Sequence, residues 1–348
     1  MISFFFHMTG ITPFVFRIRF WTRKQILIVL YHHVGPPQDP FEPAVSAGCF
    51  ERQMHFLREH FQVVSLAEAL RIKDEKLATP RPLAVITFDD GYRDNLETAY
   101  PILKKHDLPA AFFLAAGSIG NREPMWTSRV ETMFRNALPQ SLRLQTVSPP
   151  QGYVLGNPES RMKVCYQIKS HMKRVPDAQR VMILEELEEK VKISDQEKAG
   201  ADSEMLSWEE VRVLSRDPLV TLGSHSVSHR MLANLPPSEA EIEMRESREK
   251  IESEIGRPVL FFSYPGNSHN LELQKAARRA GYQAALMVEQ CLNSFQEDDY
   301  ALKRIHVEEE PLHVLKGEIS GVLPWLRSMP ARGLFKKGGE TDERKRLE

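Results

Sequence analysis

The 348-residue sequence predicts an α/β fold, a distorted (β/α) barrel of about seven or eight strands with a helical insertion. Three observations lead to this prediction. Short apolar runs alternate with segments of helical periodicity, which is typical of parallel strand–helix units. Polar side chains recur where apolar runs end, and a barrel gathers its chemistry at that end of its strands. The 42% hydrophobic content fits one large domain with insertions or two smaller ones.

The expected strands are apolar runs bounded by proline, glycine or charged residues. The uninterrupted runs 26–31 and 83–88 predict strands that are buried on both faces. Four prolines between 36 and 43 then force an extended loop after the first strand. In chain order, the expected strands are 26–31, 61–65, 83–90, 110–116, 219–224, 259–264, 282–288 and 302–307.

Helices are expected between these strands. Apolar residues at helical spacing from 50 to 61 predict the first of them. The helix after Gly91 is expected to break near Pro101, because proline lacks an amide hydrogen and clashes with the preceding turn. Three Ser-x-x-Glu pairs predict helix starts through capping boxes, and a glycine followed by proline predicts one helix end. These are Ser65 with Glu68, Ser207 with Glu210, Ser238 with Glu241, and Gly256 before Pro258.

The expected barrel domain covers residues 26–326, with three other segments around or within it. Residues 1–25 are apolar but lack the basic start and cleavage site of an export signal. A helix packed on the domain, an interfacial helix in peripheral membrane contact and an atypical export signal all remain open. The polar segment 127–205 shows helical patterns and little strand signal, so it is either a helical layer outside the barrel or a lid or wall of the substrate groove. The charged segment 327–348 is expected to be disordered.

Charge and composition limit the partners and the compartment. The formal net charge is −1, so no broad basic field would attract nucleic acid. The three cysteines are scattered, which is typical of reduced thiols in a reducing compartment. We therefore expect no nucleic-acid partner and a cytoplasmic or membrane-associated location, with export still open.

Two stretches carry candidate metal ligands. Asp89 and Asp90 follow the buried run 83–88, and two neighbouring charges there are costly unless a cation compensates them. His225 and His229 follow a second apolar run. One aspartate and two histidines form a typical ligand set for a divalent metal that keeps a position open for water. The sequence therefore predicts Asp90, His225 and His229 as metal ligands.

The remaining polar candidates offer acid–base chemistry. Adjacent side chains on a strand diverge, so Asp89 can avoid the metal and act as general base, although a helix N-cap is its competing role. His32 and His306, each at a strand end, are alternative general acids. A tight turn after the run 259–264 offers a backbone N–H to an oxyanion. The expected substrate and oxyanion contacts are Tyr264, Pro265 and Gly266.

Two tryptophans are candidates for sugar binding. Trp126 and Trp208 could each stack on a sugar ring. For any single tryptophan a position in the hydrophobic core is the commoner role. The sequence leaves both roles open.

At these residues the sequence resembles the polysaccharide deacetylase family, also called the NodB-homology family or carbohydrate esterase family 4. TFDDGY at 87–92 matches the first family motif and HSVSH at 225–229 matches the second. The similarity extends from LYHHV to RIHV. The resemblance implies a distorted (β/α) barrel, a divalent metal that is usually Zn²⁺, and removal of N- or O-acetyl groups from a sugar polymer. It also implies Asp89 as the base, with Asp90 and the two histidines of the second motif as ligands.

The sequence departs from the family pattern at the third motif. Many members carry R-x-P-Y there, and its arginine orients the base. Here Ser263 stands at the position of that arginine, so the residue that orients Asp89 is not identified. The fourth motif is not recognisable. LYHHV is similar to the start of poly-N-acetylglucosamine deacetylases, whose histidine serves as the acid, and this favours His32 over His306.

Three functional hypotheses remain. The first is a metal-dependent deacetylase of an acetylated glycan. The second keeps this chemistry but acts on a small cyclic amide or an acetylated glycolipid precursor. The third is a non-catalytic glycan-binding module, against which the intact set Asp89, Asp90, His225 and His229 argues. The first hypothesis is favoured.

Overall fold

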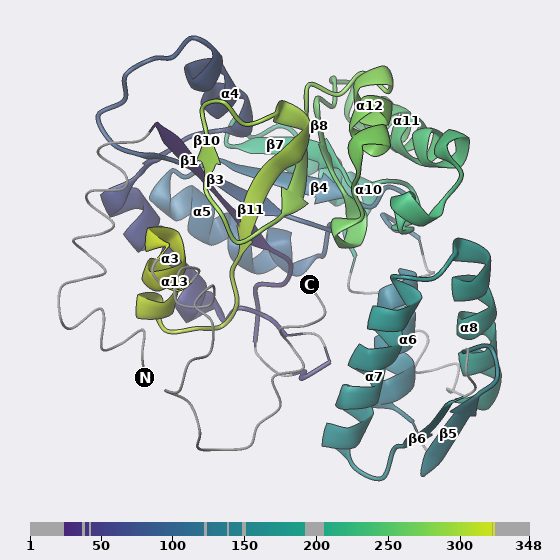
Figure 1. Cartoon of the computed structure of the whole chain (residues 1–348). Helices are drawn as coiled ribbons and strands as arrows, with labels where there is room; N and C mark the ends of the chain where they lie inside the picture. Colours follow the sequence, from purple (N-terminus) through teal and green to yellow (C-terminus); the bar gives the residue numbers. More distant parts are fainter. Residues whose placement is uncertain are drawn as a thin grey trace, which may run out of the picture.

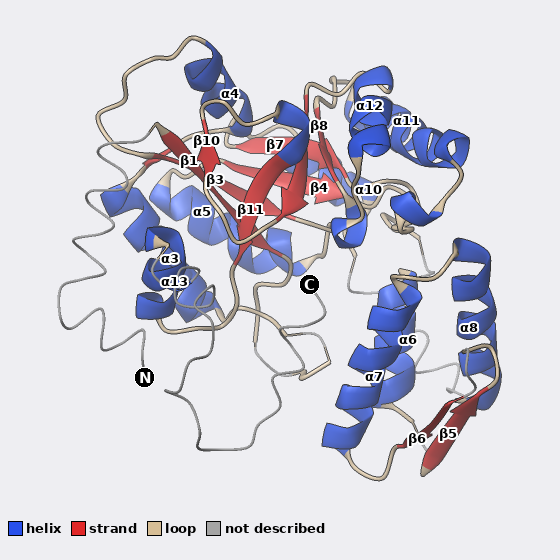
Figure 2. Ribbon diagram, in the orientation of Figure 1, coloured by secondary structure: helices blue, strands red, loops and turns tan. Residues whose placement is uncertain are grey.

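The computed structural model describes residues 24–36, 39–41, 43–121, 124–137, 139–147, 151–191, 205–321 and 323. Its central feature is a closed barrel of seven parallel strands, as predicted from the sequence (Figures 1 and 2). Each strand pairs with the next, and the last pairs again with the first. The barrel order is β1 (Gln25–Tyr31), β3 (Leu83–Phe88), β4 (Ala110–Leu114), β7 (Val220–Ser224), β8 (Phe261–Ser263), β9 (Ala284–Val288) and β11 (Leu302–His306).

The barrel is distorted where β7 meets β8. Strand β8 has three residues, and its pairing with β7 joins Ser224 to Phe262 alone. By contrast, β1 pairs with β3 over the six positions from Ile26–Leu83 to Tyr31–Phe88. Two further strands lie beside the barrel, β2 (Gln62–Val63) next to β3 and β10 (Asn293–Ser294) antiparallel to β1.

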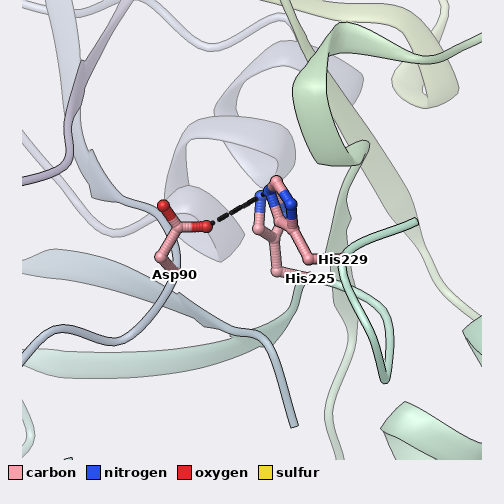
Figure 3. Close-up of side chains that lie close together, drawn as sticks. All are labelled: Asp90, His225 and His229. Atoms are coloured by element: carbon pink, nitrogen blue, oxygen red, sulfur yellow. Dashed lines mark ion pairs between the residues drawn. The ribbon is translucent and has the colours of Figure 1, made fainter. Parts of the chain in front are cut away.

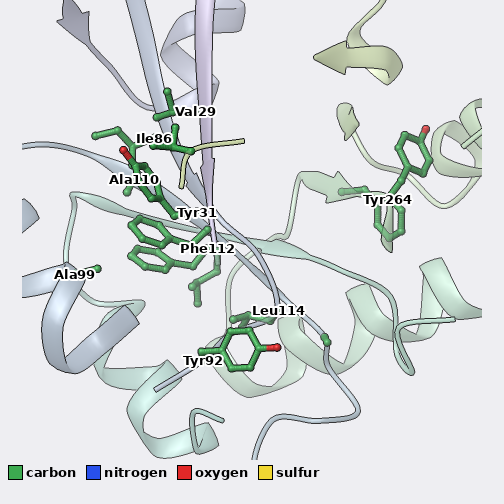
Figure 4. Packing of buried hydrophobic residues seen from close by; sticks show 14 of the residues in the cluster. Val29, Tyr31, Ile86, Tyr92, Ala99, Ala110, Phe112, Leu114 and Tyr264 are labelled. Atoms are coloured by element: carbon green, nitrogen blue, oxygen red, sulfur yellow. The ribbon is translucent and has the colours of Figure 1, made fainter. Parts of the chain in front are cut away.

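Alternation along the strands sorts side chains between the barrel interior and the helices outside. One face of the strands forms a hydrophobic cluster with helix α4 (Leu66–Asp74), which closes the barrel interior at the N-terminal ends of the strands. The other face packs against the outer helices, as Figure 4 shows for Val29, Tyr31 and Phe112. The interior residues on three strands are Ile26, Ile28, Leu83, Val85, Leu302 and, continuing the same alternation, Arg304.

The outer helices follow the sequence signals closely. The first predicted helix is α3 (Ala47–His60), and Ser65 and Ser207 cap α4 and α10 (Trp208–Leu214) as expected. The remaining outer helices are α5 (Tyr100–His106), α11 (Pro237–Ile255), α12 (Leu271–Arg279) and α13 (Leu312–Ser320), with short turns η1 (Asn95–Ala99), η3 (Leu232–Asn234), η4 (Pro265–Asn267) and η5 (Asp299–Ala301).

Two helix predictions were wrong, both for reasons of proline geometry. Helix α11 begins at Pro237, so Ser238 lies inside its first turn and does not cap it; proline fits the first helical position because its missing amide would be unpaired there. Pro101 does not break its helix. A π-helical turn, η1, runs directly into α5, and Pro101 occupies the first turn of α5.

The insertion forms a separate layer beside the barrel, seen in teal in Figure 1. It has its own hydrophobic cluster, which Phe41 and Met231 connect to the barrel. The segment is mainly helical, and a short two-stranded antiparallel sheet that the sequence pattern did not indicate lies between its first and second helices. Leu142 and Leu144 alternate with exposed residues in this hairpin, a pattern too short to stand out in the sequence. Its elements are α6 (Trp126–Arg135), β5 (Ser141–Leu144), β6 (Gln151–Val154), α7 (Pro158–Met172) and α8 (Asp177–Lys190).

The expectations for both chain ends lie outside the described residues. Residues 1–23 and 324–348 are not among those described, so the membrane, packing and export alternatives for the start of the chain and the disorder expected at its end stay predictions. Among the residues that are described, no helix combines the length and the apolar character needed to cross a bilayer.

Candidate active site

The C-terminal ends of the barrel strands bring the predicted polar residues together. Strands β1 and β3 end level with each other, and the Asp89 amide donates to the Tyr31 carbonyl at 3.0 Å. Counting alternate residues along β1, β3 and β11 places His32, Asp89 and His306 on the interior face. The site therefore forms inside the barrel mouth, where the sequence predicted it.

Asp90, His225 and His229 form a compact ligand set. The Asp90 Oδ1 atom lies 3.4 Å from the Nε2 atom of His225 and 3.4 Å from that of His229. One ligand atom from each residue lies within 4.8 Å of the others, and all three residues are buried (Figure 3). This spacing allows one ion to contact all three side chains.

The hydrogen bonding of these residues fits a divalent metal. Asp90 Oδ1 is a buried oxygen that has no hydrogen-bond partner among the described residues, which is costly unless a ligand satisfies it. His225 Nδ1 is bonded to the Ser263 carbonyl at 2.8 Å, so the tautomer with a lone pair on Nε2 faces the site. Burial, reinforced by His225, lowers the pKa of His229 far enough to keep it neutral. Neutral imidazoles and a carboxylate are the donors that such a metal requires.

A strained turn directs Asp90 toward the histidines. Its φ of 75° and the φ of 90° at Gly91 end β3 in a left-handed bend, which lets two consecutive aspartates face one site. A Cβ atom on Gly91 would lie 2.8 Å from Ile119 Cδ1 and 2.9 Å from Leu114 Cδ2. Position 91 therefore requires glycine for both its conformation and its packing.

Helix α11 holds the loop that carries the two histidines. The Glu243 carboxylate accepts hydrogen bonds from the backbone amides of Val227 and Ser228, both at 2.9 Å. The His229 amide donates to Ser226 Oγ at 3.1 Å, and His229 itself has a φ of 52°. These contacts fix the loop before any ligand arrives, so little ordering entropy has to be lost on binding.

Arg304 orients Asp89, and the sequence interpretation missed this residue. Its Nη1 and Nη2 atoms donate to Asp89 Oδ1 and Oδ2 at 2.8 and 2.7 Å. Ser263 Oγ donates to Asp89 Oδ2 at 3.0 Å and accepts from Arg304 Nη2 at 2.7 Å. Arg304, on β11, thus orients Asp89, whereas the sequence shows Ser263 at the position where many family members have the orienting arginine. The available signal was its position two residues before His306, on the same face of one strand.

The arginine also sets the protonation state of Asp89. Burial alone would raise the pKa of Asp89, but the charge of Arg304, with His225 and direct hydrogen bonds, holds it well below its usual value. Asp90 has no such partner, and burial raises its pKa. The two adjacent carboxylates therefore differ in ionisation. Asp89 stays ionised, whereas Asp90 ionises readily only when a cation lies beside it.

Both candidate acids lie next to this pair. The rings of His32 and His306 are 5.1 Å apart, edge to face. Burial lowers the pKa of both imidazoles, and His306 lowers that of His32 further. The Asn95 side chain donates to the His32 carbonyl at 2.8 Å, whereas His33 turns away to Asp94. The structure therefore places either histidine within the site.

The turn at 264–266 contributes less than the sequence predicted. The Tyr264 amide donates to the Leu286 carbonyl at 3.0 Å, and its hydroxyl donates to the Tyr300 carbonyl at 3.1 Å. Figure 4 shows the Tyr264 side chain well apart from the labelled residues of β1 and β3. Pro265 has no amide hydrogen. The Gly266 amide alone stays a predicted oxyanion donor.

From outside the barrel, the insertion supports the loop that carries His225 and His229, called here the metal loop. The buried Trp126 donates its indole N–H to the His229 carbonyl at 2.9 Å, so this tryptophan is part of the packing and not a stacking surface for sugar. Arg230 bonds Asp177 Oδ2 through Nε at 3.0 Å and Nη2 at 2.7 Å. The backbone after the second histidine is therefore attached to both α6 and α8.

Sequence comparisons identify relatives along most of the chain. The sequence model of the family described as polysaccharide deacetylase matches residues 76–154 and 164–285, more than half of the chain. YxkH of Bacillus subtilis, a protein assigned as a polysaccharide deacetylase, is 21% identical over 281 residues, which are 80% of this chain and 70% of YxkH. The poly-β-1,6-N-acetyl-D-glucosamine N-deacetylase of Staphylococcus aureus is 38% identical over 101 residues, 27% of this chain and 34% of that enzyme.

Solved structures share the fold at low sequence identity. The Streptococcus pyogenes deacetylase PplD, determined with acetate, aligns with a TM-score of 0.56 and 16% identity, over 85% of this chain and 98% of its own. IcaB from Ammonifex degensii aligns with a TM-score of 0.55 and 16% identity, over 85% of this chain and 97% of its own. These alignments extend the agreement from the sequence motifs to the barrel.

Proposed function

Because the chain belongs to the polysaccharide deacetylase family, whose members are hydrolases of carbohydrate amides, we propose that it removes N-acetyl groups from a glycan with the help of a divalent metal. Zn²⁺ is the first candidate, since one carboxylate and two imidazoles are donors that zinc prefers. O-acetyl groups are a second possible target of the same chemistry. The acetylated glycan is the proposed partner.

The observation that carries this proposal is the contrast between Asp89 and Asp90. Asp89 is held as an anion by Arg304 at 2.8 and 2.7 Å, and Asp90 presents an unpaired buried oxygen to two imidazoles at 3.4 Å. A base and a ligand set thus lie side by side without sharing an atom. A non-catalytic binding module would have no use for a preorganised anion there.

The chemistry can be assigned to residues of this chain. When bound at Asp90, His225 and His229, a divalent ion would polarise the acetyl carbonyl and make water a better nucleophile. Asp89 would accept the proton of the attacking water, in the orientation that Arg304 and Ser263 impose. As the carbon–nitrogen bond breaks, the proton accepted by Asp89 would pass through the neighbouring His32–His306 pair to the amine, and acetate would leave.

A polymer of N-acetylglucosamine is the first substrate to test. The Staphylococcus aureus relative acts on poly-β-1,6-N-acetyl-D-glucosamine by its name, and it is 38% identical over 101 residues. The site lies at the strand ends, so such a chain would have to bind across the barrel mouth. A small cyclic amide or an acetylated glycolipid precursor would use the same residues.

The experiment is acetate release from oligomers of β-1,4- and β-1,6-linked N-acetylglucosamine, with added zinc and with chelator. We expect release that chelator abolishes and zinc restores. Asp89→Asn should lower kcat by roughly 10²–10⁴-fold while the protein still binds zinc, since general-base catalysis contributes that much. Asp94→Asn, which removes a carboxylate that pairs with His33 outside the ligand set, is the matched control.

The possible results separate the hypotheses. Metal-dependent release that Asp89→Asn abolishes supports the proposal. Bound zinc without release from any oligomer would move the assignment to a small amide or a glycolipid. Protein that binds no zinc at all would contradict the assigned ligands.

A further inference from the structure

Asn95 is a fully buried residue whose side chain anchors the backbone of the candidate acid His32. Its Nδ2 atom donates one hydrogen to the His32 carbonyl at 2.8 Å and the other to Asp94 Oδ1 at 2.7 Å. Asparagine at position 94 would keep that second acceptor. Because both amide hydrogens are used, the Asn95 amide has one orientation and holds the His32 carbonyl in place.

A side-chain anchor is needed at His32 because the barrel strands have ended there. Strand β1 ends at Tyr31, and strands β3 and β11 end level with its last two residues. Backbone amides donate to the carbonyls on either side of His32, those of Tyr31 and His33, at 3.0 Å each. The His32 carbonyl between them accepts from the Asn95 side chain instead. Asn95 thus takes the place of a strand at the position of the candidate acid.

Three local costs meet at Asn95. It begins the π-helical turn η1, a rare geometry that occurs mostly at functional sites. Asparagine is also a poor helix former. Its Oδ1 atom is buried and has no hydrogen-bond partner among the described residues, which costs stability. Local rules are broken in this way where function requires a particular side chain.

His306, the other candidate acid, is placed without such an anchor. It is the last residue of β11 and pairs with Leu30 within the barrel. Its side chain is 34% exposed, so it also contacts solvent. The costs at Asn95 therefore serve the placement of His32 and not that of His306.

Gln53 is a second buried amide beside the same strand, and its contacts are those of a structural residue. From helix α3 it accepts a hydrogen bond from the Tyr31 hydroxyl at 3.0 Å and donates to Cys49 Sγ at 3.4 Å. Both ends of its amide are bonded, and it contacts β1 on the outer face, where Tyr31 packs. Gln53→Leu is therefore a matched control for the loss of a buried amide beside β1.

We propose that Asn95 is a positioning residue for His32, and that His32 rather than His306 protonates the leaving amine. This inference rests on the proposed deacetylase function and assigns one of its steps. The proton that Asp89 takes from the attacking water passes to His32, which gives it to the amine nitrogen. The nitrogen keeps the electron pair of the broken carbon–nitrogen bond, and the water oxygen stays on the acetate. Asp89 and His32 thereby return to their starting states.

The test compares the zinc-loaded full chain with Asn95→Leu, which keeps the side-chain volume but removes the donor. One substrate is an N-acetylglucosamine oligomer, whose amine needs a proton to leave; the other is 4-nitrophenyl acetate, whose nitrophenolate leaves without one. We expect kcat for the oligomer to fall about 10–100-fold, as a misplaced catalytic group costs, with KM changed less than about twofold. Hydrolysis of the ester should change less than about twofold. Gln53→Leu should leave both rates unchanged, and Asn95→Ala replaces Asn95→Leu if the latter does not fold.

A double-mutant cycle shows whether Asn95 acts through His32. In a His32→Gln background, Asn95→Leu should lower kcat for the oligomer by less than about twofold, because the residue it positions is gone. In a His306→Gln background the full loss should persist. An equal loss in both backgrounds, or a loss as large for the ester as for the oligomer, would overturn the inference and leave the deacetylase function intact.

If the unmodified chain hydrolyses no N-acetylated substrate, the proposed function has failed, and nuclear magnetic resonance of histidine-labelled protein decides the role of Asn95. The imidazole signal of His32, assigned by its loss in His32→Gln, should shift in Asn95→Leu and stay in place in Gln53→Leu. A His32 signal that does not move in Asn95→Leu would overturn the anchor, whatever the activity of the chain.

Discussion

The barrel and the insertion contribute to one site by different physical means. The barrel supplies every predicted ligand and acid–base residue from its strand ends and holds the base through a buried ion pair, with Arg304 fully buried and Asp89 2% exposed. The insertion has a hydrophobic cluster of its own and reaches the site through single contacts, such as the Trp126 bond to the His229 carbonyl. The chemistry is thus concentrated in the barrel, and the insertion contributes individual contacts to the loop that carries the two histidines.

This difference predicts how well each part of the molecule tolerates substitution. A buried charge pair tolerates little alteration, because removing one partner leaves a desolvated charge behind. The partly exposed pair of Arg230 and Asp177, at the start of α8, should tolerate much more. Substitutions should therefore cost most in the barrel pair, less at the bond between insertion and loop, and least at the ion pairs around it.

The largest effect is expected from Arg304→Met. This change leaves Asp89 buried and unpaired, so the free energy of unfolding at pH 7 should fall by about 3–5 kcal/mol. Urea denaturation followed by circular dichroism measures this loss. Arg278→Met, which removes an arginine from an exposed pair with Asp298, should cost less than about 1 kcal/mol.

The same pair predicts a dependence on pH. Arg304 depresses the folded-state pKa of Asp89, so the stabilisation is complete above the unfolded-state pKa of about 3.9 and is lost as the pH falls below it. Without Arg304, burial raises the folded-state pKa of Asp89, so protonation relieves the buried charge in the variant as the pH falls. The difference in unfolding free energy between the unmodified chain and Arg304→Met should therefore be largest near pH 7 and above, shrink as the pH falls toward 5, and shrink further below about 4. A difference that instead grew in acid would contradict the assignment of Asp89 as the buried anion.

A smaller effect is expected where the insertion holds the metal loop. Trp126→Phe keeps the packing but leaves the His229 carbonyl without its indole donor, at a cost of about 1–3 kcal/mol. Zinc affinity, measured by competition with a chelator, should fall roughly tenfold as the loop loosens. Trp208→Phe is the control, since that indole packs against Gly120 and below the Lys250 ammonium group. Unchanged zinc affinity in Trp126→Phe would show that the barrel alone fixes the loop.

The smallest effect is expected from Arg230→Gln. The Arg230 side chain is 26% exposed and that of Asp177 13%, but Asp177 keeps its second partner Arg180 at 2.8 Å, so the loss of Arg230 should cost about 1 kcal/mol. Hydrogen exchange should nevertheless quicken at the start of α8, where Asp177 lies. Arg279→Gln, which removes an exposed pair with Glu241, is the control. A loss as large as that of Arg304→Met would mean that barrel and insertion do not differ as described.

The fold could be read from the sequence because its signals are local. The runs 26–31 and 83–88 lie in β1 and β3, and Ser207 caps α10 through a reciprocal bond with Glu210. Predictions failed where local signals competed. Pro237 displaced the expected cap at Ser238, and the short alternation around Leu142 was hidden among helical patterns.

The candidate site could be predicted only in part from the sequence. The base and ligand candidates lie in two short motifs, one with Asp89 and Asp90 and one with His225 and His229. Their residue types and spacing are therefore visible in the sequence. Arg304 is 215 residues away from Asp89 in sequence, and an arginine in an apolar strand looks like many surface arginines. Its role depends on β11 closing the barrel against β1, a pairing that no local pattern specifies.

The sequence alone determined the barrel class, the strand ends that carry chemistry and the four residues of the two motifs, because hydrophobic periodicity and motif spacing are properties of neighbouring residues. The tertiary structure decided that Arg304 fixes the base, that His32 and His306 meet, and that Trp126 supports the loop carrying His225 and His229. Each of these contacts joins residues far apart in the chain, and barrel closure and the docking of the insertion bring them together.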